Sequence, residues 1–354
     1  MRSSRSRRLP LRAYCLPLVS ALALTLSACR SPSTERTFVA RHGDEIIVAG
    51  QLFRTGTRVI TWMDPGGYDA YRVERRFSPY AESGWTPSQA AVKELTSPNR
   101  YGLRAAVLTP EAIERVRGGG WELAHLQEVV DQFVVHYDAC GLSKICFDVL
   151  HDQRGLSVHF LLDIDGTVYQ TLDLKERAWH ATTSNSRSIG IEIAHVGAFA
   201  PGDTRVTDRW YRRSADGRGT VITIPAAIRD PGIHTPGFVG RPARPEPVAG
   251  IMQGQSLVQY DFTPEQYAAL IKLTAALGTV FPKIRLEAPR DAEGQVITTK
   301  LPDDQLAAFQ GVIGHHHIQT NKIDPGPAFD WDKVLAGARA LQAPAPQLRG
   351  RPGS

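Results

Sequence analysis

The chain has 354 residues, 42% of them hydrophobic and 22% charged, which is ordinary for a globular protein with one large domain or two modest ones. Its formal net charge of +5 comes from residues 1–29, which contain five arginines and no acidic residue. Without them, 36 basic side chains face 36 acidic ones, and this balance gives no support to a nucleic-acid-binding function.

Residues 1–29 have the pattern of a bacterial export signal. A basic stretch precedes the apolar run 16–26, which is too short to remain in a bilayer as a spanning helix. The run ends in the sequence LSAC, which fits a lipoprotein cleavage site at all four positions, so we expect a lipid anchor on Cys29. A plain secretory signal is the alternative. The pattern predicts an exported, periplasmic protein, and Arg30 favours the outer membrane over the inner one.

Two cysteines remain if Cys15 and Cys29 belong to the signal. These are Cys140 and Cys146. In an oxidising compartment an even pair is more typical of a disulfide than of a metal or redox site, so we expect these two residues to form one.

Residues 30–125 are expected to form a tether and an N-terminal extension. Two β-like runs, 45–49 and 57–62, are punctuated by glycine and proline. Thr109 and Pro110 then have the types expected at the N-cap and first position of a helix. No chemistry can be assigned to this region, which we expect to pack on the core or to shape a substrate groove.

Residues 126–341 contain the patterns expected of the main domain. A short apolar strand ends in His136, and a helix is predicted over 143–151. Two further strands, 157–164 and 167–170, flank an Asp-Gly pair that favours a two-residue hairpin turn. The strand 189–194 then carries a single acidic residue among apolar ones.

The same domain is interrupted by two insertions, at about 197–260 and 285–304. The first is rich in proline and glycine and loses periodicity apart from 220–224. Between the insertions, Thr263 begins a long amphipathic helix with a capping box. Residues 342–354 are expected to be a disordered tail.

The segment 314–331 suggests a metal site. It contains three consecutive histidines followed by Lys322 and Asp324. Imidazole and carboxylate groups bind Zn²⁺, and a catalytic zinc needs only three ligands from the protein. We therefore propose His136, His315 and Asp324 as ligands. A solvated, histidine-rich loop is the alternative.

Six motifs occur in the order found in one known superfamily. The chain resembles the zinc-dependent N-acetylmuramoyl-L-alanine amidases of the type-2 amidase and peptidoglycan-recognition-protein superfamily over roughly residues 130–340. The motifs are VH at 135–136, SVHFLL at 157–162, DGTVYQ at 165–170, RAWHA at 177–181, SIGIE at 188–192 and GH…KIDPGPAFDW from 314 to 331. The resemblance implies an α/β fold with a central mixed β-sheet flanked by α-helices, and zinc at the carboxyl edge of the sheet.

The resemblance also implies a role for each site residue. The zinc ligands fall on His136, His315 and Asp324, the catalytic carboxylate on Glu192 and the catalytic lysine on Lys322. Three protein ligands leave a coordination position for water, Glu192 is suited to act as its general base, and Lys322 can stabilise the oxyanion.

Several features are left open by the sequence. The loop from His315 to Asp324 is one residue shorter than in the most similar amidases, so His316 is an alternative ligand. His159 and His180 match superfamily positions near the cleft, where substrate contact and structural hydrogen bonding are equally compatible. Recognition proteins of the superfamily often carry a short disulfide where Cys140 and Cys146 lie.

The function implied is hydrolysis of the amide bond between N-acetylmuramic acid and L-alanine in peptidoglycan or muropeptides. A non-catalytic peptidoglycan-binding module of the same fold is the alternative, although such members typically lack a third metal ligand. A glycosidase using carboxylates alone is a weaker hypothesis, because it leaves the histidine cluster unexplained.

Overall fold

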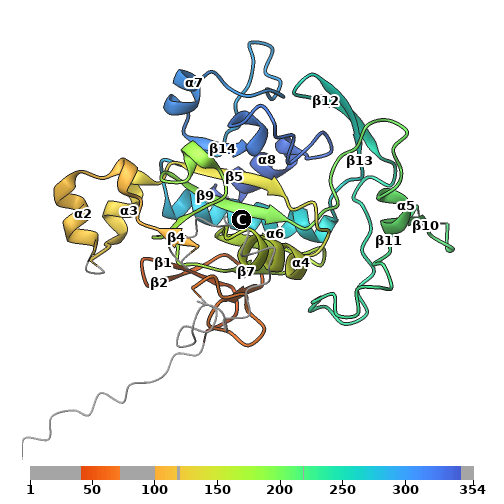
Figure 1. Cartoon of the computed structure of the whole chain (residues 1–354), viewed down its shortest axis with the longest axis horizontal. Helices are drawn as coiled ribbons and strands as arrows, with labels where there is room; N and C mark the ends of the chain where they lie inside the picture. Colours follow the sequence, from red (N-terminus) through yellow and green to blue (C-terminus); the bar gives the residue numbers. More distant parts are fainter. Residues whose placement is uncertain (1–40, 72–99, 118–119, 218, 344–354) are drawn as a thin grey trace, which may run out of the picture. The chain divides into compact units, whose positions relative to one another are not determined.

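The computed structural model describes residues 41–71, 100–117, 120–217 and 219–343 (Figure 1). The expected signal, the Cys29 anchor and nearly all of the expected tail lie outside these ranges. Within them, no helix combines the length and the apolar character needed to cross a membrane.

The centre of the molecule is a six-stranded sheet in which parallel pairing predominates (Figure 1). Neighbouring strands pair in parallel except for β6 and β7, which form an antiparallel hairpin. The edge strand β3 comes from the expected N-terminal extension, so part of that extension belongs to the central sheet. In spatial order the strands are β14 (Gly311–Gly314), β5 (Gln132–Tyr137), β9 (Ser188–Ile193), β6 (Phe160–Leu162), β7 (Val168–Gln170) and β3 (Val59–Thr61).

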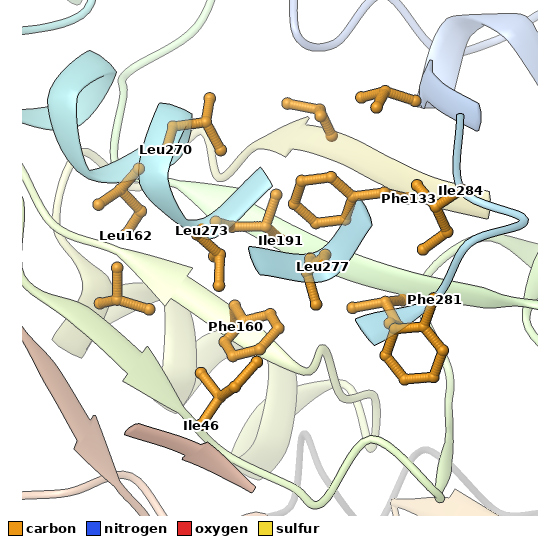
Figure 2. Close-up of a cluster of buried hydrophobic side chains, with 14 of the residues drawn as sticks. Ile46, Phe133, Phe160, Leu162, Ile191, Leu270, Leu273, Leu277, Phe281 and Ile284 are labelled. Carbon is orange, nitrogen blue, oxygen red and sulfur yellow. The ribbon is translucent and has the colours of Figure 1, made fainter. Parts of the chain in front are cut away.

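Helices cover both faces of this sheet. On one face, α6 (Pro264–Val280) packs against the sheet through leucines that meet Phe133, Phe160 and Ile191 (Figure 2), and α8 (Trp331–Gln342) belongs to the same core. On the other face, α4 (Ser143–Phe147) packs against Leu161. Side chains alternate between faces along a strand, so Phe160 and Leu161 enter different layers. The predicted mixed sheet flanked by helices is confirmed.

Local signals placed the ends of several elements correctly, with one exception. Thr263 caps α6 in a complete capping box with Gln266.

The predicted two-residue hairpin turn is wrong. Asp163 and Thr167 still pair through a backbone hydrogen bond of 2.9 Å, so the loop has three residues, and Asp165 does not adopt the positive φ that a two-residue turn of this kind requires.

The first insertion contains more regular structure than its sequence predicts. It forms the short helix α5 (Thr207–Trp210) and two antiparallel hairpins. The hairpin strands are β10 (Tyr211–Arg213) with β11 (Thr220–Ile222), and β12 (Val248–Met252) with β13 (Gln255–Gln259).

The remaining described elements are short, from two to eight residues each. The predicted helix over 143–151 divides into α4 and a π-helical segment, η3. These remaining elements are β1 (Glu45–Val48), β2 (Gln51–Arg54), β4 (Tyr101–Gly102), β8 (Arg177–Ala178), α2 (Pro110–Arg117), α3 (Leu123–Val129), α7 (Asp303–Ala308), η2 (Ala105–Val107), η3 (Asp148–Gln153) and η4 (Thr182–Ser184).

Candidate metal centre

Two neighbouring parallel strands bring the first two candidate ligands together. His136 is the fifth residue of β5, and His315 begins the 3₁₀ turn η5 (His315–His317) directly after β14. Because β14 and β5 are parallel neighbours, their carboxyl ends meet at one edge of the sheet. Asp324 returns to the same edge from the loop that follows η5. All three residues are buried, with 1%, 5% and 8% of their surfaces exposed for His136, His315 and Asp324.

The three side chains converge on one point. The Nδ1 atoms of His136 and His315 are 3.0 Å apart, and they lie 2.9 Å and 3.1 Å from Oδ2 of Asp324. Within the described residues, these three side chains form a group of the kind that can hold a metal ion. Burial, reinforced by His315, lowers the pKa of His136 to about 4. Burial acts to raise the pKa of Asp324, but His315 and the hydrogen bonds from both histidines lower it overall.

The donor set fits a bound cation better than a set of hydrogen bonds. Two imidazole nitrogens and one carboxylate oxygen form a triangle with edges close to 3 Å. A neutral imidazole has one nitrogen that carries a proton and one that carries a lone pair. Because Asp324 contributes only one oxygen to the buried cluster, the Nδ1 atoms of the two histidines also face each other. A cation at the centre would accept all three lone pairs, and two nitrogens with one carboxylate oxygen suit zinc.

The Nε2 atom of each of these two histidines, which points away from the cluster, lies within hydrogen-bond distance of an acceptor. Nε2 of His136 lies 3.0 Å from Nδ1 of His180, and Nε2 of His315 lies 2.7 Å from Oε1 of Gln319. Each ring can therefore donate from Nε2 while Nδ1 faces the centre, which is the usual arrangement for metal-bound histidine. Sequence reasoning missed Gln319, although its position four residues after His315 on a helical turn is a signal for such a pair.

His180 owes its place to a glycine in the adjacent strand. A Cβ atom at Gly190 would lie 2.5 Å from the His180 ring, which is too close for any side chain. The ring then reaches Oγ of Ser188 through Nε2, at 3.3 Å. His159 is turned away from the ligands, with Nδ1 accepting from Gly190 N and Nε2 facing the carbonyl of Glu176. Both histidines are hydrogen-bonded; His159 is fully buried, whereas His180 is partly buried and lines the cavity over the cluster.

Glu192 lies beside His136 on the neighbouring strand. The two residues are direct partners in the parallel register of β5 and β9 and point to the same face, opposite α6. Burial raises the pKa of Glu192, and the negative charges of Asp324 and Asp138 raise it further. Its Oε2 atom is buried and has no hydrogen-bond partner among the described residues. A buried acceptor without a partner is the expected state of a group that acts on a ligand.

A cavity of about 270 Å³ opens onto this cluster. All five predicted site residues line it, as do His180 and the half-buried Tyr137. Arg154 and Asn321, which sequence reasoning did not single out, also contribute to its wall. Lys322 is only partly buried, and its side chain lines the cavity beside the cluster.

The structure places His315, and not His316, in the cluster. Both ring nitrogens of His316 face backbone carbonyls, Nδ1 that of Asp324 at 3.0 Å and Nε2 that of Ile297 at 3.1 Å. His317 likewise accepts from Gly314 N and faces the Ile297 carbonyl. The second and third histidines of the run therefore hold the loop in shape.

The two cysteines are neighbours at the wall of the same cavity. Both are free thiols, and Cys146 is buried. Burial raises the pKa of the Cys146 thiol, and its hydrogen bond with Cys140 raises it further. The expected disulfide stays a prediction.

Comparisons with solved structures and curated proteins give the following results. A selenomethionine derivative of AmpD is 18% identical, with a TM-score of 0.32, covering 67% of this chain and 89% of that one. The N-acetylmuramyl-L-alanine amidase AmiD from E. coli is 19% identical, with a TM-score of 0.34 and coverages of 59% and 57%. The endolysin amidase LysCS from Clostridium intestinale URNW is 15% identical, with a TM-score of 0.32 and coverages of 60% and 86%. No curated protein matches the chain.

Family assignment rests on the sequence of the central domain. Residues 126–221 match the family model described as N-acetylmuramoyl-L-alanine amidase. This segment includes β5 and β9 and therefore two of the residues at the cluster, His136 and Glu192. Residues 126–221 are thus similar in sequence to the N-acetylmuramoyl-L-alanine amidase family.

Proposed function

We propose that this protein is a zinc-dependent N-acetylmuramoyl-L-alanine amidase that hydrolyses the bond between N-acetylmuramic acid and L-alanine in peptidoglycan or muropeptides. The observation that carries this proposal is the convergence of three buried ligand atoms beside a carboxylate with an unpartnered oxygen, in a chain similar in sequence to that family over residues 126–221. The cavity over the cluster gives a polymer-derived substrate access to it.

His136, His315 and Asp324 would hold the zinc ion. When bound there, zinc would lower the pKa of a coordinated water and polarise the substrate carbonyl. The Nε2 hydrogen bonds to His180 and Gln319 keep both imidazoles oriented with Nδ1 toward the ion.

Glu192 would act as the general base and then as the general acid. Its raised pKa favours taking up the proton of the attacking water at the unpartnered Oε2. The protonated carboxyl can then deliver that proton to the alanine nitrogen as the carbon–nitrogen bond breaks. The products are a free carboxyl group on the lactyl arm and a free amino group on the peptide.

Lys322 would stabilise the negative charge that develops on the carbonyl oxygen. It lines the same cavity as Glu192 and is close enough to oppose the rise in that group's pKa. A positive charge aimed at a developing oxyanion in a site shielded from water is worth a few kcal/mol, about 10²-fold to 10³-fold in rate.

Metal analysis and product analysis together test this function. The purified protein should hold about one zinc per chain, and digestion of muropeptides should release peptides that begin with free L-alanine. A protein with an intact fold and no metal would favour the binding module instead. New reducing sugar ends would indicate a glycosidase.

We also propose that the protein is exported and held at the outer membrane by a lipid on Cys29. The support is the sequence LSAC at residues 26–29 after an apolar run, followed by Arg30. Replacing Cys29 by alanine should move the protein from the membrane fraction to the soluble one. An unchanged distribution between the fractions would contradict the anchor.

A disulfide between Cys140 and Cys146 is a third expectation for the exported protein. The two cysteines line the same cavity, and an oxidising compartment favours the bond. Intact protein from the periplasm should be lighter by two hydrogens than after reduction. A full complement of reactive thiols before reduction would contradict it.

A further inference from the structure

The β12–β13 hairpin of the first insertion lies against the loop that carries two of the metal ligands. Its tip residue, Gln253, places one side-chain amide nitrogen among three carbonyl oxygens of that loop. Nε2 of Gln253 lies 2.7 Å from the oxygen of His316, 3.0 Å from that of Gln319 and 3.1 Å from that of Lys322. One side chain thus spans the loop between His315 and Asp324.

The oxygen of the Gln253 side-chain amide also has a hydrogen-bond partner. Oε1 of Gln253 accepts from the backbone N–H of Lys300, and the backbone N–H of Gln253 donates to Thr298, both in the second insertion. The nitrogen faces only acceptors and the oxygen faces a donor, so the orientation of the amide is fixed by its partners. Both insertions therefore meet at this residue.

Gln253 occupies a backbone conformation that glutamine rarely adopts. It has φ of +51° and Gly254 has φ of +74°, as in a two-residue hairpin turn between Met252 and Gln255. Glycine, asparagine or aspartate normally occupies the first of these positions because other side chains are strained there. A strained residue whose side chain makes three hydrogen bonds to another segment indicates a role for that side chain.

A second glutamine of the hairpin holds the loop on the far side of Asp324. Gln259 is buried, donates to the carbonyl oxygen of Pro325 at 3.0 Å and accepts from the N–H of Ala328 at 2.9 Å. Met252 and Leu257 of the hairpin also pack with Ile323, the residue next to Asp324. The hairpin thus contacts the loop before, beside and after this ligand.

From these contacts we propose that the β12–β13 hairpin is a clamp for the metal loop and that Gln253 is a positioning residue for zinc binding and for Lys322. This inference rests on the proposed function and gives part of the insertion a role in it. His315, Lys322 and Asp324 lie in η5 and the loop after it, which have no sheet pairing of their own. The hairpin adds hydrogen bonds to those that His316 and His317 make within this segment.

The test compares Gln253→Asn with Gln255→Asn in the full chain. Asparagine suits the turn but is one methylene too short to reach the three carbonyls. Gln255 lies on the same hairpin with an exposed side chain, so its shortening is the matched control. Zinc affinity, measured by competition with a chelator, should fall about 10-fold to 100-fold for Gln253→Asn and stay unchanged for Gln255→Asn. A lower kcat with little change in KM should accompany it.

Hydrogen exchange in the metal-free proteins separates this proposal from the proposed function. Amides of residues 318–322 should exchange faster in Gln253→Asn than in the unsubstituted chain, whether or not the protein is an amidase. Gln253→Gly, which removes the strain in the turn, should show the same faster exchange without a lower metal-free melting temperature. Unchanged exchange and zinc affinity, or an equal effect of Gln255→Asn, would overturn the clamp. A clamp confirmed by exchange in a chain that binds no zinc would overturn the proposed function alone.

Discussion

Replacing Glu192 by glutamine is expected to lower kcat by about 10³-fold while the zinc content stays at the level of the unsubstituted protein. Glutamine has the same shape but cannot take a proton from water, and Glu192 is not one of the three converging ligand residues. Because the side chain is partly buried and carries an unpartnered oxygen, loss of its charge should not destabilise the fold. Steady-state hydrolysis of a muropeptide and metal analysis on the same sample measure both quantities.

Glu128→Gln is the matched control, because Glu128 is exposed on α3 and does not line the cavity. It should leave both quantities unchanged. A zinc-free Glu192→Gln protein would identify Glu192 as a metal ligand or as support for one. Full activity with zinc in place would exclude it as the general base.

Removal of His315 should have the largest effect on the metal. His315→Ala takes away one of three ligand atoms, and we expect zinc affinity to fall by about 10³-fold and hydrolysis to be lost. His316→Ala should retain zinc, because its ring nitrogens face backbone carbonyls and not the cluster. It should cost about 1–3 kcal/mol of stability, since the buried ring and its hydrogen bonds to the carbonyls of Asp324 and Ile297 are lost.

Equilibrium dialysis against zinc and thermal unfolding of the metal-free proteins distinguish the two variants. A His316→Ala protein that loses zinc, paired with a His315→Ala protein that keeps it, would reverse the assignment. Equal zinc retention in both would remove the histidine run from the site altogether.

The residues on the sheet were the most predictable part of the site. The alternation of β9 leaves Glu192 on the opposite face from its apolar neighbours, and the apolar run of β5 ends in His136. These are local patterns with a fixed period of two. A local pattern gave the wrong turn at Asp165 and Gly166, because the same residue types also fit a three-residue loop, which changes the register of the two strands.

The supports of the site could not be predicted from the sequence. Gln253 reaches a loop more than sixty residues away along the chain, and no periodicity marks a glutamine that binds carbonyls. The place of His180 depends on a missing Cβ at Gly190, which sequence alone presents as one glycine in a strand. Such contacts arise from the tertiary arrangement.

The pairing of His136 with Glu192 on adjacent strands fixes their relative position, whereas the position of the other two ligands depends on a loop. Their separation is inherited from the spacing of adjacent strands, about 4.8 Å, and a slip of one residue would turn Glu192 into the layer of α6. The other two ligands arrive on a loop whose length and supports can vary without disturbing this pair. Substitutions in the loop of divergent or engineered versions of this chain can therefore change which metal binds and with what affinity. The Glu192 carboxylate keeps its position beside His136.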